Sequence, residues 1–135
     1  MAAFTAKQVS ELATVLGQPV PETYLAFLRD YPAELASRRY EGLEDLISDY
    51  ELLRDPVRVI EENEMVREED IWTEEGPWPS THMVIGVDMG GDVVALRLDE
   101  PGLPVERLLT EVARFERVAA NVREYAEQLL SQDQA

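Results

Sequence analysis

One stretch, residues 81–99, restricts the fold of this 135-residue chain more than any other. Two runs rich in β-branched and other apolar residues flank the sequence Asp-Met-Gly-Gly-Asp at residues 88–92, which is typical of two strands joined by a tight turn. A two-residue type I′ turn requires positive φ at both central positions, and Gly90 and Gly91 adopt this conformation without a Cβ clash. The stretch therefore predicts an antiparallel hairpin over about residues 82–98.

The predicted turn also sets the register of the hairpin. Side chains alternate along a strand and paired residues share a face, so one face is expected to carry six apolar residues. These are the pairs Val87 with Val94, Ile85 with Leu96, and Met83 with Leu98. The other face is expected to carry Val84 and Ala95. We assign a structural role in the turn to four residues, Asp88, Gly90, Gly91 and Asp92.

Helix signals surround the hairpin. They predict helices over residues 5–16, with Thr5 as N-cap, from Pro21 to Pro32, from Asp55-Pro56 to about Arg67, and over residues 121–132, with Asn121 as N-cap. Further strands are predicted at residues 48–53, 105–109 and 113–118. The expected fold class is therefore α+β: a single domain, residues 1–135, in which N-terminal, middle and C-terminal helices pack an antiparallel sheet with a central hairpin.

The charge of the chain limits the classes of partner. It has 28 acidic residues, 12 basic residues and a formal net charge of −16. Binding to nucleic acid or to an anionic membrane requires a concentrated basic patch, and the longest basic run is the pair Arg38-Arg39. No apolar run is long enough to span a membrane, and no signal-peptide pattern is present, so we expect a cytoplasmic protein.

The acidic charge is concentrated in residues 61–76, where eight residues are acidic and Arg67 is the single base. Trp72 lies within this segment and Trp78 just beyond it. The segment is either a solvated loop or a contact surface for a basic protein, and each tryptophan is either packed or an exposed anchor. The residues predicted to bind a partner are Glu68, Glu69, Asp70, Trp72, Glu74, Glu75 and Trp78.

Residues for catalysis or cofactor binding are scarce. The chain has no cysteine, so disulfides, a thiol nucleophile and Cys-ligated zinc are excluded. His82 is the only histidine, and Asp88 and Asp92 lack the alternating ligands of a calcium loop. We predict no catalytic residue, metal ligand or cofactor. An enzyme would require a buried polar cleft that holds His82 with two or more carboxylates.

Several segments, taken in order, resemble the SUKH superfamily, which is named for the Smi/Knr cell-wall-assembly regulators and includes many bacterial toxin-immunity proteins. They are Pro-x-x-Tyr at residues 21–24 with the apolar pairs that follow, the segment from Leu53-Arg-Asp-Pro56 to Glu64, Trp78 with Ile-Gly-x-Asp-x-Gly-Gly-Asp at residues 85–92, and Val-Ala-Ala-Asn at residues 118–121 leading to Tyr125. The resemblance covers about residues 19–130. The strand after the hairpin departs from it, because family members often place an aromatic residue and an Asp or His there.

The resemblance implies an α+β fold and a non-enzymatic protein-binding role, in bacteria commonly the neutralisation of a secreted toxin by direct contact. Many such toxins are nucleases, which are basic because they hold phosphates, so an acidic antagonist fits them electrostatically. The alternative is a regulatory or scaffold protein that binds a housekeeping partner. An enzyme is the remote third class.

Overall fold

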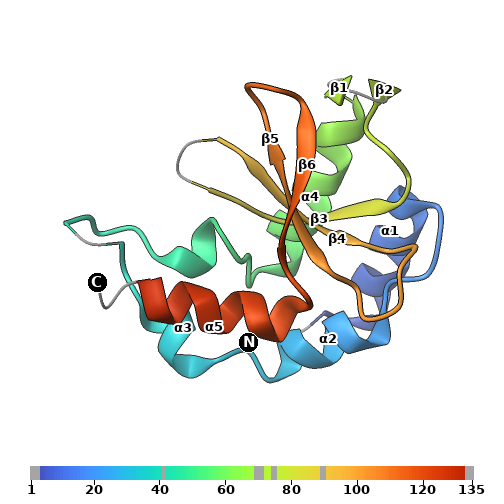
Figure 1. Cartoon of the computed structure of the whole chain (residues 1–135). Coiled ribbons are helices and arrows are strands. Elements are labelled where there is room, and N and C mark those ends of the chain that lie inside the picture. Colours follow the sequence, from blue (N-terminus) through green and yellow to red (C-terminus); the bar gives the residue numbers. More distant parts are fainter. Residues whose placement is uncertain (1–3, 41, 69–71, 74–75, 89–90, 133–135) are drawn as a thin grey trace.

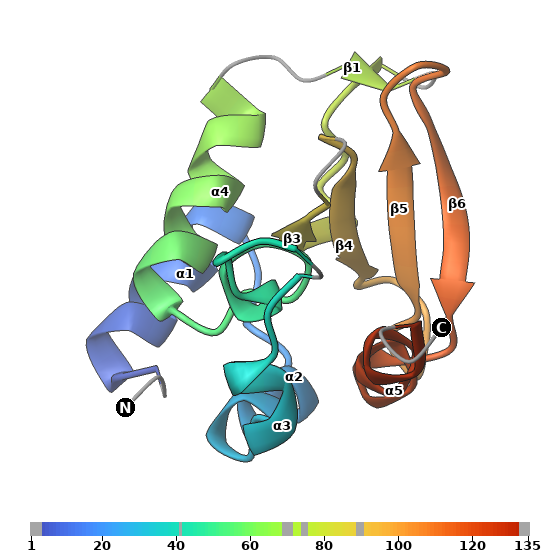
Figure 2. The ribbon, with the colours of Figure 1, turned by 90° about the vertical axis from the view of Figure 1, so that its left-hand side faces the viewer.

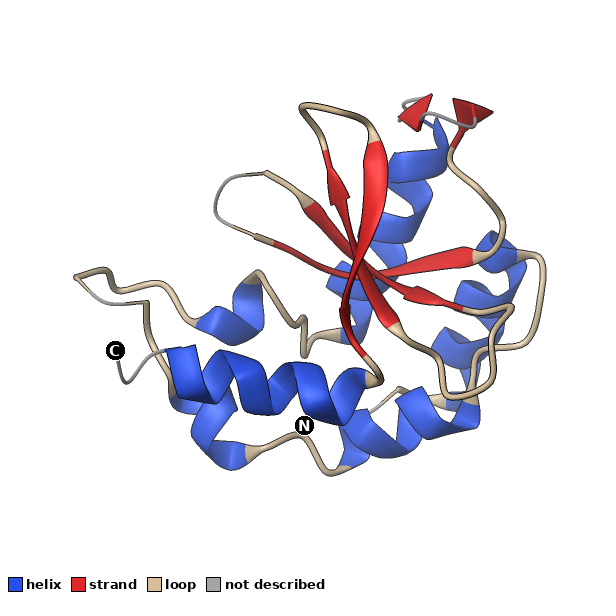
Figure 3. Cartoon of the chain, in the orientation of Figure 1, coloured by secondary structure: helices blue, strands red, loops and turns tan. Residues whose placement is uncertain are grey.

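The computed structural model describes residues 4–40, 42–68, 72–73, 76–88 and 91–132. Within them, helices cover a four-stranded antiparallel sheet, and a separate pair of two-residue strands lies beside it, which confirms the predicted α+β class (Figures 1 and 3). The elements in chain order are α1 (Ala6–Leu16), α2 (Glu22–Arg29), α3 (Ala33–Ser37), the 3-10 helix η1 (Ile47–Asp49), α4 (Pro56–Glu68), β1 (Trp72–Thr73), β2 (Gly76–Pro77), β3 (His82–Val87), β4 (Val93–Arg97), β5 (Val105–Leu109), β6 (Arg114–Ala119) and α5 (Val122–Gln132).

The sheet has the strand order β3-β4-β5-β6, so each strand pairs with its neighbour in the sequence. β3 and β6 form the two edges. Figure 2 shows α1 and α4 on one side of the sheet, and α2, α3 and α5 at its lower end. The hairpin predicted over about residues 82–98 is confirmed as β3 and β4.

Apolar side chains are buried on both faces of the sheet. The larger core, which we call the helix-side core, contains Met83, Ile85, Val94 and Leu96 together with residues of α1, α2, α4 and α5. The smaller core, which we call the far-side core, contains Val66, Trp78, Val84, Val93, Ala95 and Leu108, with Phe115 packed against it. Burial on both faces explains why β3 and β4 read as nearly continuous apolar runs.

The predicted register of the hairpin is wrong. Val87 pairs with Val93 rather than Val94, because the loop is one residue longer than predicted. Met83 pairs with Leu96 rather than Leu98, because a β-bulge at Ile85 shifts the register by one further residue between Val84 and Gly86. The predicted faces nevertheless hold for Met83 and Leu96, since a shift of two residues leaves a side chain on its original face. Val87, which was expected in the same apolar cluster, is only half-buried and is not part of it.

The two-residue type I′ turn is also wrong. The Asp88 amide donates to the Asp92 carbonyl at 2.9 Å, so three residues separate the paired positions. The Gly91 amide donates to the Asp88 carbonyl at 3.0 Å, and Gly91 has a φ of +93°, which is typical of three-residue hairpin loops. Gly91 thus has the positive φ that was expected of it, whereas Gly90 lies outside the described residues.

The predicted strand at residues 48–53 is wrong. The segment contains the end of η1 and a turn instead of a strand, and Leu52 and Leu53 are both buried. It still runs along the edge of β3, because the Leu53 amide donates to the Ile85 carbonyl and the Val87 amide donates to the Tyr50 carbonyl, each at 2.9 Å.

The predicted helix starts are confirmed. Thr5 and Gln8 form a reciprocal capping box at α1, and the Asp55 carboxylate accepts from the Val57 amide at 3.0 Å where α4 begins. The Asn121 side chain accepts from the Glu124 amide at 2.9 Å at the start of α5. The second predicted helix is shorter than expected, because α2 ends at Arg29.

Candidate protein-binding site

The acidic segment begins on α4, whose two sides differ in chemistry. Residues on the inner side are buried against the sheet and α1: Val59, Ile60, Asn63 and Val66. Residues on the outer side are exposed: Val57, Glu61, Glu64, Met65 and Glu68, which we call the α4 outer face. Val57 is 48% exposed and Met65 40% exposed, so two apolar contacts lie among three carboxylates. An acidic helix face with apolar contacts has the composition that a basic protein surface complements.

Of the seven residues predicted to bind a partner, Glu68 lies on this face and is exposed. Glu69, Asp70, Glu74 and Glu75 lie outside the described residues. The predicted set does not include Val57 and Met65, which are exposed on the same face. Their helical spacing from Glu61 and Glu68 places them on one side, and that signal was available in the sequence.

The structure describes Trp72, within the acidic segment, and Trp78, just beyond it, to different extents. Only the backbone of Trp72 is described, and it pairs with Pro77 in the small β1–β2 ladder. Trp78 is 8% exposed, and its indole N–H donates to the His82 carbonyl at 2.9 Å. Its ring meets Phe115 edge-on at 5.6 Å. Trp78 therefore follows the packing alternative and offers little surface to a partner.

Asp88 and Asp92, the acidic residues of the turn, hold backbone groups in place. A carboxylate oxygen of Asp88 accepts from the Asp92 amide at 3.0 Å. A carboxylate oxygen of Asp92 accepts from both the amide and the hydroxyl of Thr110, each at 3.0 Å, and so ties the β3–β4 loop to the β5–β6 loop. Within the described ranges, no group of three or more His, Asp or Glu side chains is arranged to hold a metal ion. Asp88 and Asp92 therefore hold main-chain and side-chain groups within the β3–β4 loop and between the two loops.

His82 is the centre of a buried polar cluster. Its Nε2 lies 2.8 Å from Glu106 and its Nδ1 lies 2.9 Å from the Thr81 hydroxyl, so both ring nitrogens are occupied. His82 and Glu106 are 4% and 5% exposed, and the imidazole is stacked on Phe115 at 4.0 Å. A substrate has no access to such a pair, and one carboxylate rather than two contacts the ring.

Two arginines neutralise the buried carboxylate of Glu106. Arg97 approaches it at 3.6 Å and Arg117 at 3.5 Å. Arg97 also donates to Asp99 at 2.7 Å, and this hydrogen bond raises the pKa of Arg97 and lowers the pKa of Asp99. A buried carboxylate is tolerated only with such partners, so the cluster stabilises the far side of the sheet. The sequence analysis did not predict it, since Glu106 is distant in sequence from His82.

Comparison with known proteins identifies the family to which the chain belongs. The model of the SMI1/KNR4 family (SUKH-1) matches residues 3–128, and the resemblance to the SUKH superfamily is thereby confirmed. Because the match covers most of the sequence, the chain belongs to the SMI1/KNR4 family. No curated protein and no solved structure gave a significant match.

The family supplies a coarse function. It is known for immunity and regulatory roles, it is generally non-catalytic, and its members bind partner proteins. No helix in the described part of this chain is both long enough and apolar enough to cross a membrane.

Proposed function

We propose that this protein is an immunity-type protein that neutralises a toxin by direct contact, and that the toxin is a basic protein such as a nuclease. The single observation that carries the proposal is the α4 outer face in a chain of net charge −16 that belongs to an immunity and regulatory family. Glu61, Glu64 and Glu68 supply long-range attraction, and Val57 and Met65 supply apolar contact. The protein acts in the cytoplasm in this proposal and requires no cofactor.

The interface includes the acidic residues that follow α4. Glu69, Asp70, Glu74 and Glu75 continue the negative charge of the helix in the sequence. Like charges on one surface repel each other, and a basic partner offsets that repulsion and gains association rate through electrostatic steering. The immunity role is favoured over a housekeeping role because a phosphate-binding toxin supplies the required positive surface.

The alternative is a regulatory or scaffold protein with a housekeeping partner, which the family also contains. The identity of the partner separates the two. The tagged protein is used to capture its partner from cells of the source organism, and mass spectrometry identifies it. A basic nuclease encoded beside this gene supports the immunity role, whereas a housekeeping protein establishes the alternative.

The interface is tested by association kinetics with the captured partner. Replacing Glu61, Glu64 and Glu68 by Gln is expected to slow association about tenfold in low salt, because steering depends on the charge facing the partner. The difference should shrink between about 0.01 M and about 0.15 M salt, as the Debye length falls from about 30 Å to about 8 Å.

A control variant changes three exposed acids away from α4, namely Glu44, Glu111 and Glu116, to Gln. It has the same net charge as the α4 variant, so it measures the effect of total charge alone. Equal slowing of both variants would show that the attraction is not localised on α4. If neither variant slows association, the interface lies on another surface of the molecule.

A further inference from the structure

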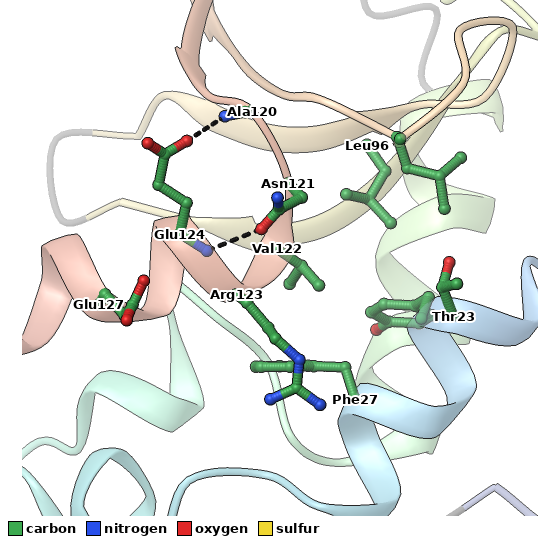
Figure 4. A pocket seen from close by; sticks show the side chains of 12 residues that line it. Thr23, Phe27, Leu96, Ala120, Asn121, Val122, Arg123, Glu124 and Glu127 are labelled. Carbon is green, nitrogen blue, oxygen red and sulfur yellow. Dashed lines mark hydrogen bonds between the residues drawn. The ribbon is translucent and has the colours of Figure 1, made fainter.

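A cavity lies between α2 and the first turns of α5, on the helix side of the sheet (Figure 4). Its volume is about 590 Å³, which is sufficient for one large amino-acid side chain or a small amphiphile. The cavity is separate from the α4 outer face, and its lining includes no residue predicted to bind the partner. It therefore indicates a binding site that goes beyond the proposed function.

Most of the inner wall of the cavity is apolar. Phe27 from α2, Leu96 from β4 and Val122 from α5 line it, and all three are buried residues of the helix-side core. Leu103 adds a half-buried apolar surface from the loop between β4 and β5. A ligand that fills this space must carry an apolar body.

Hydrogen-bond donors gather at one side of the cavity. Arg123 lies in the first turn of α5, with its guanidinium 6.0 Å from the centre of the Phe27 ring, and it forms no ion pair with any residue in the described ranges (Figure 4). A positive charge at the N-terminal end of a helix interacts unfavourably with the helix dipole. The first backbone hydrogen bond of α5 runs from the Tyr125 amide to the Asn121 carbonyl. The amides of Val122 and Arg123 therefore have no hydrogen-bond acceptor within the helix.

A second, independent polar group is Tyr24, which also lines the cavity. The whole side chain is buried, and its hydroxyl has no hydrogen-bond partner among the residues that the structure describes. Burial raises the pKa of Tyr24, so the hydroxyl stays protonated at neutral pH and remains an unused donor in the wall of the cavity. A buried hydroxyl without a partner is costly, and a ligand that accepts from it removes that cost.

Two carboxylates also line the cavity and restrict what enters it. Glu124 is turned toward Ala120, whose amide donates to its carboxylate, so it serves as part of the helix cap (Figure 4). Glu127 lies one turn further along α5, is exposed and forms no ion pair within the described part of the chain. Glu127 weakens the binding of an anion at Arg123, and this opposing effect gives a sharp test.

The geometry points to a site for a carboxylate carried on an apolar body, with Arg123 and the first amides of α5 as donors to the carboxylate and Phe27, Leu96 and Val122 around the apolar part. Arginine and helix N-termini are typical binders of carboxylates. Such a ligand comes from one of two sources: the C-terminal residue of a peptide, or a free amphiphilic acid.

The test titrates the full chain with three probes and follows backbone amide shifts by NMR. N-acetylphenylalanine represents a C-terminal residue, octanoate represents a free amphiphilic acid, and N-acetylphenylalaninamide is the neutral match of the first probe. We expect an acid to shift the amides of residues 122–124 and to bind about tenfold more tightly than the amide, since a carboxylate gains a charge-assisted hydrogen bond. Whichever acid binds more tightly identifies the source.

Variants then show which side-chain charges affect binding of the probes. Arg123→Gln is expected to weaken acid binding about tenfold and to leave binding of the neutral amide unchanged. Glu127→Gln should strengthen acid binding alone, because it removes the opposing charge. Tyr24→Phe should weaken acid binding about threefold without loss of folding, since it removes only a hydroxyl that lacks a partner. Arg114→Gln, an exposed base on β6, is the control and should change nothing.

Three outcomes would overturn the proposal. Equal binding of the acid and the neutral amide would reduce the cavity to an apolar groove. An effect of Arg114→Gln as large as that of Arg123→Gln would show that the acid responds only to total charge. Absence of any shift at residues 122–124 with every probe would show that the cavity binds no such ligand.

Discussion

At the scale of single residues, Gly86 has the strictest requirement in the described part of the chain. A Cβ atom built at this position would lie 2.1 Å from the backbone oxygen of Glu51, which crosses β3 there. The obstruction is main chain rather than a flexible side chain, so it has no easy way to move. Gly91 differs, because it has open space around it but a φ of +93°.

Gly86→Ala is therefore expected to lower the free energy of unfolding by about 3 kcal/mol through overpacking. Gly91→Ala serves as the comparison, because it adds the same methyl group where nothing obstructs it. It should cost only about 1 kcal/mol, from the positive φ. Urea unfolding followed by circular dichroism measures both. A smaller cost for Gly86→Ala than for Gly91→Ala would mean that residues 50–53 do not press against β3.

At the scale of elements, the edge of β3 is closed by a side chain of α4. The Asn63 amide group donates to the Val84 carbonyl at 2.9 Å and accepts from the Val84 amide at 2.8 Å, as a neighbouring strand would. It also donates to the Val59 carbonyl of its own helix at 2.8 Å. This contact protects the edge strand from unwanted pairing and fixes α4 against the sheet.

Replacement of Asn63 by Ala leaves both polar groups of Val84 buried without partners. We expect a loss of about 3 kcal/mol in the free energy of unfolding, together with faster hydrogen exchange at the Val84 amide. Asn121→Ala is the matched change at an exposed helix cap, and it should cost about 1 kcal/mol, with faster exchange confined to residues 122–124. Equal costs for the two variants would contradict the role of Asn63 as an edge-strand substitute.

At the scale of the whole molecule, the net charge of −16 opposes the compact state through self-repulsion. The pairs between exposed side chains, such as Arg29 with Glu22, are worth little in water, so they do not offset this repulsion. The net charge thus lowers the stability of the fold at low ionic strength.

Salt should therefore stabilise the protein. Raising the ionic strength from about 0.01 M to about 0.15 M is expected to raise the thermal midpoint by about 4 °C, the shift that ~1 kcal/mol produces in a chain of this size. Thermal scans by circular dichroism at fixed pH measure it, and the Glu61/Glu64/Glu68→Gln variant should show a smaller rise. A midpoint that falls with salt would show that attractive ion pairs dominate the charge balance.

The sequence alone determined the features that depend on neighbouring residues. Helix starts at Thr5, Asp55 and Asn121 were predicted correctly, because a cap and the amides it satisfies lie within four residues of each other. The hairpin was predicted because its turn and its two apolar runs are adjacent. The sequence also predicted the family, since membership depends on motifs that occur in a fixed order along the chain.

The features that join distant segments depend on tertiary packing. The requirement for Gly86 depends on the Tyr50–Leu53 backbone, which packs along β3 more than thirty residues away in sequence. The burial of Trp78 depends on Phe115, and the cavity depends on how α2 meets α5. Local patterns carry no information about such encounters, because each is settled by which segments the packed core brings together.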